Sequence, residues 1–386
     1  MLQTQGILRG HSCAKDARDA VRELHEQIAQ ARMELVVFFC SSAYDLDALA
    51  VEIGSRFAGV QVVGCTTAGE IGPAGYCDYS VSGASFPTDG FSIVAGAIEG
   101  LRTFDTGIGQ NLAQHLLQRL EHRAPHLSTQ DSFAFLLIDG LSVREEPVTR
   151  ALQSAFSDLP LVGGSAGDGL EFRRTHVYFD GAFRNDSAVV VLGATRAPFR
   201  IFKTQHFVTV NRRVVVTSAD PATRLVREID GRLAAEVYAE LVGVDVGNLD
   251  PMRFAAAPMV VVIDGTNYVR SIQRANPDRS LTFFCAIESG LVLRVARGEN
   301  LLGNLEETFA GLRADIGEPQ LVLACDCILR KLEIAQSTDR ERVVNLLREN
   351  RTVGFNTYGE QYHGVHVNQT LTGIAFGASA NGELHG

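Results

Sequence analysis

Three glycine-rich turns, each closed by an acidic residue, are the segments of this sequence whose composition is best suited to chemistry. They read Gly64-Cys-Thr-Thr-Ala-Gly-Glu70, Gly163-Gly-Ser-Ala-Gly-Asp168 and Gly354-Phe-Asn-Thr-Tyr-Gly-Glu360. A carboxylate at such a place can accept hydrogen bonds from the backbone amides of its own turn. It can also face a ligand, because the carboxyl ends of strands in open α/β sheets border binding crevices. The sequence leaves both interpretations open.

The third turn has the richest set of polar side chains around it. If the strand ends converge on a crevice, Arg330 can clamp a ligand carboxylate there. The predicted ligand-binding residues are Cys325, Asp326, Arg330, Asn356, Thr357, Tyr358 and Glu360. No catalytic residue is assigned, because no phosphate-binding loop, nucleophile elbow or local nucleophile–base motif stands out. We therefore expect a binding protein and not an enzyme.

Two histidines, His363 and His366, follow the third turn directly. Histidine is a common axial ligand of haem iron, so these two are the candidate axial ligands if the protein holds haem. The alternative is that both are hydrogen-bonded residues of a loop or strand. The sequence contains no Cys-x-x-Cys-His motif, which excludes covalent haem attachment of that kind. No metal other than haem iron is expected.

A pair of cysteines, Cys325 and Cys327, stands at the end of the third buried strand. Their spacing is too short for the usual Cys-x-x-Cys zinc motif. The neighbouring Arg330 and Lys331 can lower the pKa of a thiol, which makes a thiol-based redox or interaction module an alternative function. Packing as small apolar side chains is the other interpretation. The seven cysteines of a chain this long predict no disulfide framework.

Each turn ends the same succession of elements. The apolar runs 35–40, 133–138 and 321–325 predict strands buried on both faces. In the first two copies a helix is expected to end near residues 57 and 156. In the third copy the helix is expected to span 339–350, and residues 326–333 are expected to connect it to the strand before it. A polar triplet after each turn opens a further strand, at 81–86, 188–192 and 371–376. Three such copies predict an α/β fold of two domains, with repeated strand–helix–strand units and mixed sheets.

The region 200–317 departs from this plan, because it is richer in short strands. A proline follows the end of an apolar strand near residue 198, where we place a boundary. The predicted domains are therefore 1–199, which holds two repeat units, and 200–386, which holds the third unit and the candidate ligand pocket.

Charge and composition exclude several kinds of partner. The chain has 386 residues, a formal net charge of −10 and 46% hydrophobic residues. An acidic protein lacks the basic face that binds nucleic acid, and it is not attracted to anionic lipid. No apolar run reaches the roughly 18 residues of a spanning helix, and the N-terminus does not resemble a signal peptide. We expect a cytoplasmic protein.

The first turn resembles the signature of the N-terminal FIST domain. The segments Cys325-Asp-Cys-Ile-Leu-Arg330, Gly354-Phe-Asn-Thr-Tyr-Gly-Glu360 and Asn368-Gln-Thr-Leu-Thr372 resemble the C-terminal FIST domain. The resemblance covers nearly the whole chain and implies a sensory or adaptor role in signal transduction.

Within the FIST family the chain looks like the NosP group. That resemblance implies non-covalent binding of haem b, a response to nitric oxide, and regulation of a partner histidine kinase. A haem-free FIST sensor of a small carboxylated metabolite, such as an amino acid, is the alternative. Both are compatible with a homo-oligomer.

Overall fold

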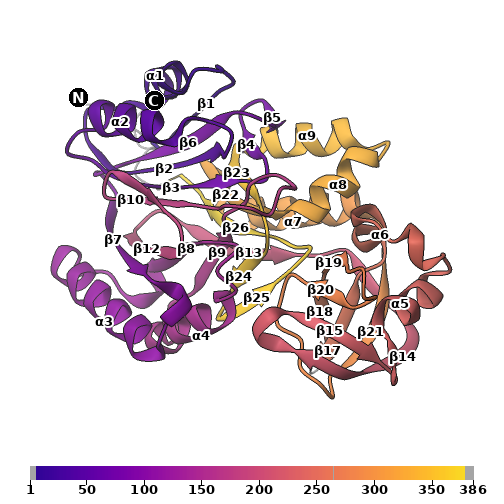
Figure 1. Ribbon diagram of the computed structural model, residues 1–386. Helices are drawn as coiled ribbons and strands as arrows, with labels where there is room; N and C mark the ends of the chain where they lie inside the picture. Colours follow the sequence, from indigo (N-terminus) through magenta and orange to yellow (C-terminus); the bar gives the residue numbers. More distant parts are fainter. Residues whose placement is uncertain (1–5, 264, 379–386) are drawn as a thin grey trace.

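Three copies of one structural unit and one inserted domain make up the described part of the chain (Figure 1). The computed structural model describes residues 6–263 and 265–378. We call the copies unit 1, unit 2 and unit 3. Each unit has the succession strand, helix, strand, helix, strand, hairpin, strand, with two consecutive helices at the second helix position of unit 3.

The elements of the units correspond one to one along the chain. Unit 1 consists of β1 (Leu8–Ser12), α1 (Ala17–Ile28), β2 (Met33–Ser41), α2 (Leu46–Arg56), β3 (Gln61–Thr67), β4 (Glu70–Gly72), β5 (Gly75–Cys77) and β6 (Val81–Pro87). Unit 2 consists of β7 (Phe91–Glu99), α3 (Thr106–Arg123), β8 (Ser132–Ile138), α4 (Glu145–Phe156), β9 (Leu161–Ser165), β10 (Val177–Phe179), β11 (Ala182–Arg184) and β12 (Ser187–Thr195). Unit 3 consists of β13 (Phe199–Thr204), α7 (Leu301–Ile316), β22 (Leu321–Cys327), α8 (Ile328–Gln336), α9 (Arg340–Glu349), β23 (Thr352–Thr357), β24 (Glu360–Tyr362), β25 (Val365–Val367) and β26 (Leu371–Phe376).

The strand order is the same in the sheets of all three units. It runs β1-β6-β2-β3 in unit 1, β7-β12-β8-β9 in unit 2 and β13-β26-β22-β23 in unit 3. The last two strands of each sheet are parallel, whereas the others pair antiparallel. Three mixed sheets with one topology are what the sequence repeats predict.

Each sheet is completed by a hairpin from a different unit. The β4–β5 hairpin of unit 1 pairs with β23 of unit 3, the β10–β11 hairpin of unit 2 pairs with β3 of unit 1, and the β24–β25 hairpin of unit 3 pairs with β9 of unit 2. Unit 1 thus pairs with unit 3, unit 2 with unit 1, and unit 3 with unit 2. Each unit contributes one hairpin to the sheet of another unit.

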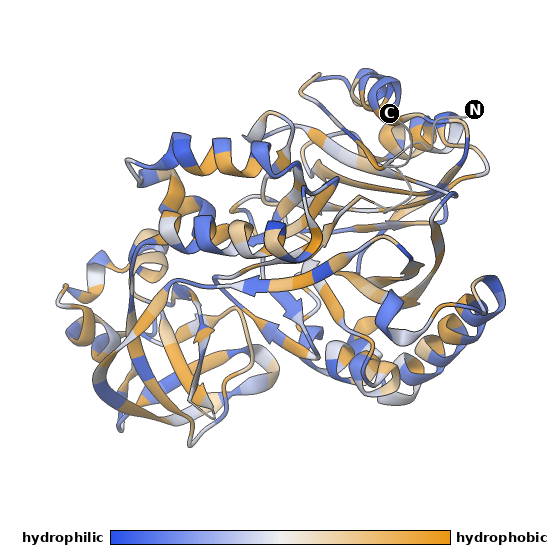
Figure 2. Ribbon diagram, turned by 180° about the vertical axis from the view of Figure 1, so that it is seen from behind, coloured by the Kyte–Doolittle hydropathy of each residue, from blue (hydrophilic) through white to orange (hydrophobic). Residues whose placement is uncertain are grey.

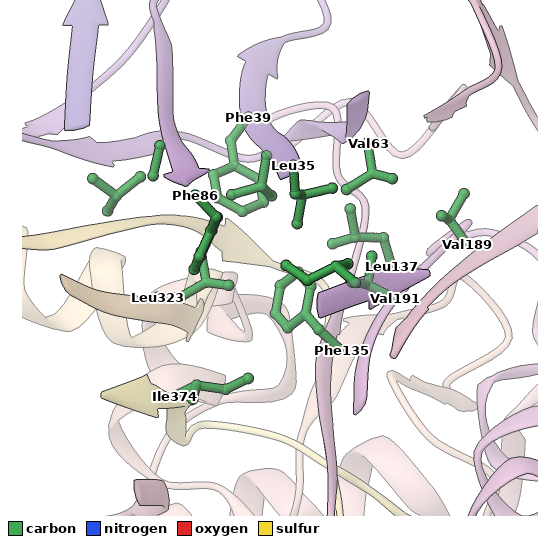
Figure 3. Close-up of a cluster of buried hydrophobic side chains, with 14 of the residues drawn as sticks. Leu35, Phe39, Val63, Phe86, Phe135, Leu137, Val189, Val191, Leu323 and Ile374 are labelled. Carbon is green, nitrogen blue, oxygen red and sulfur yellow. The ribbon is translucent and has the colours of Figure 1, made fainter. Parts of the chain in front are cut away.

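One apolar core joins the three sheets. Figure 3 shows side chains from all of them converging, among them Phe39 of unit 1, Phe135 of unit 2 and Leu323 of unit 3. Helices pack on the outer faces with their apolar sides inward, which gives the alternating blue and orange helix faces of Figure 2. In α1, for example, Asp16 caps the first amides and Leu24 is buried.

The inserted domain, residues 207–298, lies between β13 and α7 of unit 3 (Figure 1). Its strands follow the order β18-β17-β21-β14-β15-β20-β19, with β16 paired to β15. The two outermost strands, β18 and β19, are separated along the chain by Ser271 alone, which requires a strongly curved sheet. Its elements are β14 (Phe207–Asp220), β15 (Leu225–Ile229), β16 (Arg232–Leu233), α5 (Ala234–Val242), α6 (Pro251–Ala256), β17 (Met259–Ile263), β18 (Thr266–Arg270), β19 (Ile272–Ala275), β20 (Leu281–Phe283) and β21 (Val292–Gly298).

The predicted fold class is confirmed: the chain is α/β, with repeated strand–helix–strand units and mixed sheets. One local prediction is wrong, because 326–333 is no connecting loop. The strand continues through Cys327 and α8 begins at Ile328, whose side chain is buried with those of Leu329 and Ile334. The division at residue 199 stays a prediction. No helix among residues 6–263 and 265–378 has both the length and the apolar character to cross a membrane.

Candidate functional site

The turn acids of units 1 and 3 occupy equivalent positions and have the same role. Glu70 accepts hydrogen bonds from the hydroxyl of Thr67 and from the amide and hydroxyl of Ser80. Glu360 accepts them in the same way from Thr357 and Thr370. Burial raises the pKa of Glu70 to about 7 and that of Glu360 to about 8, although these hydrogen bonds oppose the rise. Both carboxyl groups therefore tie the turn to the strand that follows.

Asp168 does not occupy the equivalent position in unit 2. Glu70 and Glu360 each begin a hairpin and pair with the sheet of another unit, opposite Phe355 and Gly164. In the hairpin of unit 2 the residue at this position is Val177, which pairs opposite Cys65. The Asp168 carboxylate instead accepts the backbone amides of residues 172, 173 and 174 and the hydroxyl of Tyr358. A longer loop in unit 2 separates the glycine turn from its hairpin, which moves the acid out of register with the other two.

The seven predicted ligand-binding side chains are all buried, and their hydrogen bonds divide them into separate groups. Asp326 bonds to Arg330 and Asn356, Thr357 bonds to Glu360, and the Tyr358 hydroxyl bonds to Asp168. None of the seven residues is more than 2% exposed. Asp326 accepts from Arg330 Nε at 2.8 Å and from the Tyr76 hydroxyl at 2.7 Å. Asn356 Nδ2 donates to the same carboxylate at 3.3 Å. Arg330 therefore binds the carboxylate of Asp326, whereas the sequence predicted that it would bind the carboxylate of a ligand.

His206 extends this buried ion pair. A guanidinium only donates, so His206 Nδ1 accepts from Arg330 Nη1 at 3.2 Å. Its Nε2 then carries the hydrogen and donates to Glu333 at 2.8 Å. The network joins the hairpin of unit 1, through Tyr76, to α8 of unit 3 and to the segment that leads into the inserted domain.

The Cys325 and Cys327 thiols are packed inside the protein. Both are at most 1% exposed, and burial raises the pKa of each thiol well above its ordinary value. A reactive cysteine needs the opposite, a lowered pKa and access to solvent. The geometry favours the packing interpretation of this pair.

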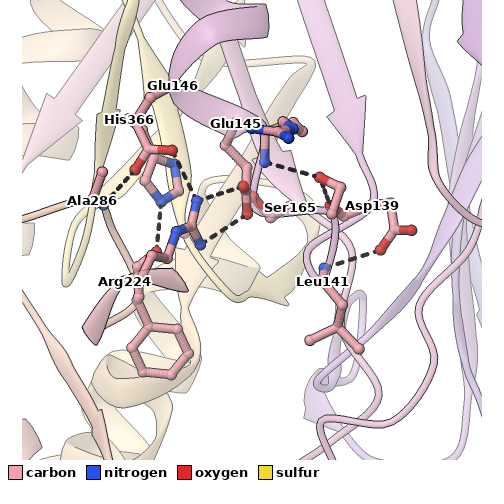
Figure 4. Close-up of polar contacts among 12 residues, drawn as sticks. Asp139, Leu141, Glu145, Glu146, Ser165, Arg224, Ala286 and His366 are labelled. Carbon is pink, nitrogen blue, oxygen red and sulfur yellow. Dashed lines mark hydrogen bonds and ion pairs between the residues drawn. The ribbon is translucent and has the colours of Figure 1, made fainter. Parts of the chain in front are cut away.

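A second polar cluster lies where unit 2, unit 3 and the inserted domain meet (Figure 4). Arg224 of the inserted domain donates to Glu145 at 2.5 Å and to Glu146 at 2.8 Å, both in the first turn of α4. Glu146 also accepts the amide of Ala286 at 2.8 Å. Burial raises the pKa of Glu145 to about 7. For Glu146 burial is the largest single influence and also raises the pKa, but Arg224, His366 and backbone amides together outweigh it and hold the pKa at about 2. Glu146 is thus the firmly ionised acid of the cluster.

His366 belongs to this cluster. Its Nε2 donates to the carbonyl of Phe284 at 3.2 Å, and its Nδ1 accepts from Gln361 at 3.3 Å. Burial lowers the pKa of His366 to about 4, so the ring is neutral near pH 7. Around it the buried polar atoms Gln361 Oε1, Asn368 Nδ2 and Ser271 Oγ have no hydrogen-bond partner in the described part of the chain. Such orphaned atoms are costly unless water or a ligand satisfies them.

A cavity of about 170 Å³ opens beside this cluster. At roughly 30 Å³ per water molecule, it has room for about five waters or one small organic molecule. Within residues 6–263 and 265–378, no ion pair involves Arg150 or Arg270. The cavity is lined by Glu146, Arg150, Arg270, Cys285, Ala286, Gly364, Val365 and His366.

The two histidines do not fit a haem as they stand. Both ring nitrogens of His366 are engaged, and its cavity is smaller than the roughly 300–1,000 Å³ of pockets for drug-sized ligands. His363 lies at the turn of the β24–β25 hairpin with its ring edge-on to Tyr362 at 4.4 Å, and it does not line this cavity. A haem needs a free imidazole in a dry apolar pocket, which neither histidine provides in this conformation.

Protonation of His366 gives a testable pH dependence. The folded-state pKa of about 4 lies below the ordinary 6.5, so as the pH falls the unfolded chain takes up the proton first and stability is lost between pH 6.5 and 4. The free energy of unfolding, measured by urea denaturation, should therefore fall between pH 7 and pH 5 by about 2 kcal/mol less in His366→Gln than in wild type. His122→Gln, at an exposed position of α3, should behave as wild type. Equal losses in wild type and His366→Gln would contradict the assignment.

Sequence reasoning missed most residues of this cluster. Glu145 and Glu146 begin a helix, which is where acids are common for electrostatic reasons, so nothing marks them as a site. Arg224 lies 79 residues further along the chain and Arg270 further still. Only His366 was singled out. A site assembled from three parts of the chain has no local spacing to recognise.

Comparison with known proteins identifies the family. The model of the FIST N domain matches residues 34–232, and that of the FIST C domain matches residues 234–363. No curated protein sequence matches the chain. A cyanuric acid hydrolase from A. caulinodans is similar in structure with a TM-score of 0.36 at 9% identity, over 97% of this chain and 99% of its own.

A further cyanuric acid hydrolase structure, described as an innovation by structural concatenation, has a TM-score of 0.32 at 11% identity, over 76% of this chain and 99% of its own. Similarities this low have no bearing on what the protein does. The family matches are different, because together they cover residues 34–232 and 234–363: the chain belongs to the FIST family of signal-transduction sensor domains.

Proposed function

We propose that this FIST protein is a sensor that binds a small carboxylate in the cavity between unit 2, unit 3 and the inserted domain. The observation that carries the proposal is the pair of arginines, Arg150 and Arg270, that line the cavity without an ion-pair partner in the described chain. Arginine matches a carboxylate with two parallel charge-assisted hydrogen bonds. The anionic Glu146 suits the ammonium group of an amino acid. Binding, not turnover, is the proposed activity.

Signal transmission would follow from the position of the cavity. Its lining comes from α4 of unit 2, the hairpin of unit 3 and two segments of the inserted domain. A ligand that contacts all three parts stabilises their closed arrangement, and only such differential binding can shift a two-state equilibrium. The proposed recipient is a partner sensor histidine kinase, as the NosP resemblance implies.

Ligand binding is tested by thermal unfolding with a panel of small carboxylates and amino acids. A ligand at 100 times its Kd stabilises the native state by about 2.7 kcal/mol, which raises the Tm measurably. Arg270→Met should weaken binding of the best ligand at least tenfold in titration calorimetry, because a charge-assisted hydrogen bond contributes about 1.5–3 kcal/mol.

The matched control is Arg274→Met, since Arg274 is an exposed arginine on β19, the next strand along the chain, and does not line the cavity. It should bind the ligand as wild type does. If no carboxylate raises the Tm of wild type, or if Arg270→Met binds as tightly as Arg274→Met, the proposed function is wrong.

Haem binding and a nitric-oxide response rest on the sequence resemblance. Absorbance spectra of protein titrated with haem test them directly. A saturable Soret band at one equivalent that moves with nitric oxide would support the haem sensor and require a rearrangement at His363 or His366. The absence of a saturable band would leave the carboxylate sensor.

A further inference from the structure

A second cavity, of about 530 Å³, lies between unit 1 and unit 2 and shares no lining residue with the cavity beside His366. It is bordered by the end of α2 and the start of β3 in unit 1, and by β7, α3 and the turn of the β10–β11 hairpin in unit 2 (Figure 1). Its volume falls within the roughly 300–1,000 Å³ of pockets that hold small organic ligands. The cavity therefore has room for a ligand of its own.

Side chains cover the outer edge of β7, the last strand of the unit 2 sheet, at two successive places. At Ile93, Glu34 accepts the backbone amide at 2.9 Å and Arg123 donates to the backbone carbonyl at 2.9 Å. Glu34 and Arg123 also form an ion pair with each other at 2.7 Å. Each of the two charges at Ile93 thus has a partner.

The second place, Ala95, has the same arrangement but lacks the acid. Gln61 Oε1 accepts the amide of Ala95 at 3.1 Å, and Arg119 Nη1 donates to its carbonyl at 3.0 Å. Gln61 is neutral, and Arg119 has no ion pair in the part of the chain that the structure describes, although Arg123 one turn later has one. Both Gln61 and Arg119 line the cavity. The backbone of Ala95 therefore fixes a cation without a countercharge at the cavity wall.

The turn of the β10–β11 hairpin contributes polar groups of another kind. Asp180 and Gly181 have φ values of 49° and 78°, as expected for the two-residue turn of a tight hairpin. This turn places Asp180 at the cavity, next to Tyr178, which also lines it. Burial raises the pKa of Tyr178 to about 12, so the hydroxyl keeps its proton and can donate. A carboxylate acceptor and a phenolic hydroxyl are suited to the hydroxyl groups of a ligand.

We propose that this cavity binds a hydroxylated carboxylic acid, whose carboxylate supplies the countercharge that Arg119 lacks. The guanidinium offers the ligand the donors that Ala95 leaves free, in a geometry that matches a carboxylate. The hydroxyl groups of the ligand donate to Asp180 and accept from Tyr178. This ligand contacts both unit 1 and unit 2, and its site goes beyond the sensor cavity proposed above.

Titration calorimetry with gluconate and hexanoate tests the site, because these two six-carbon acids differ only in their hydroxyl groups. Gluconate should bind wild type at one site per chain, and hexanoate should bind at least tenfold more weakly. Arg119→Met should weaken gluconate binding at least tenfold, since a charge-assisted hydrogen bond contributes that much to an affinity.

Gln61→Glu is the sharper variant, because it gives Ala95 the arrangement that exists at Ile93. The new carboxylate should accept the Ala95 amide, pair with Arg119 and abolish gluconate binding. Nε2 of Gln61 is buried without a hydrogen-bond partner among the described residues, so the substitution removes no contact. The midpoint of urea denaturation should therefore stay at or above that of wild type.

Two controls remove an arginine elsewhere. Arg123→Met changes the same helix outside the cavity and should bind gluconate as wild type does. Arg270→Met changes the cavity beside His366 and should also keep gluconate binding, so the two proposed sites fail independently.

The proposal is overturned if gluconate does not bind wild type, or if its binding survives in Arg119→Met or in Gln61→Glu. Equal affinity for hexanoate would overturn the role of the hydroxyl groups. Tighter binding of glucose 6-phosphate than of gluconate would overturn the choice of a carboxylate.

Discussion

Replacing Gly354 by alanine is expected to prevent unit 3 from folding correctly. A β-carbon at Gly354 would lie less than 3.0 Å from the backbone oxygen and carbon of Ala324. Both residues lie in the paired parallel strands β22 and β23, so neither backbone can move aside without breaking the ladder. Overpacking a core typically costs about 1–3 kcal/mol, and we expect the upper end or more here because the obstacle is main chain. Urea denaturation and soluble yield measure the loss.

Gly311→Ala is the matched control in the same unit. Gly311 lies in α7, where nothing surrounds an added β-carbon within 4 Å, so alanine should stabilise the protein by up to about 1 kcal/mol through its helix propensity. Unchanged stability of Gly354→Ala would contradict the close packing.

The same reasoning explains why the repeats share a glycine at this point. An added β-carbon at Gly64 would lie 2.5 Å from the carbonyl oxygen of Phe38, and one at Gly163 would meet that of Leu136. These are the equivalent pairs of units 1 and 2. The glycine of each turn thus marks close approach of two strands around the common core. The shared glycine correctly indicated the repeat, but it is needed for the packing of the two strands and not for ligand binding.

Local patterns predicted the elements of each unit because the periodicity of apolar residues along a segment shows which of its faces is buried. The apolar runs became β2, β8 and β22, and the helices before the turns became α2, α4 and α9. The destination of the hairpins was not predictable in this way. A hairpin shows the same alternation whichever edge it joins, so the pairing of Glu70 with Phe355 across 285 positions leaves no local trace.

The candidate site was predicted only in part for the same reason. The sequence placed a cluster around the third turn, and the structure joins three of its seven side chains, Asp326, Arg330 and Asn356, in a buried network. Spacing shows which side chains share an edge of a sheet, but not whether another segment covers that edge. Here Tyr76 from the unit 1 hairpin and His206 from the segment before the inserted domain bond to the charged groups that a ligand would otherwise have met.

Asp326→Ala is expected to be the most damaging single change in this network. Arg330 is 1% exposed, and without Asp326 its guanidinium would keep His206 as its remaining hydrogen-bond partner but lose its countercharge. Arginine stays protonated at any accessible pH, so the charge cannot be relieved by losing a proton. Removing one partner of a buried ion pair costs about 3–5 kcal/mol. Urea denaturation at pH 7 should show a loss of this size.

Arg330→Met should cost less, and its cost should depend on pH. Burial already raises the pKa of Asp326, and without Arg330 the carboxyl can take up a proton and become neutral. Its folded-state pKa would then lie above the unfolded value, so the variant should be most stable in acid and lose stability as the pH rises through that folded pKa. The double variant Asp326→Ala/Arg330→Met should recover part of the Asp326→Ala loss, because no charge stays buried. Equal losses for both single variants at every pH would show that the network is not an ion pair in the folded protein.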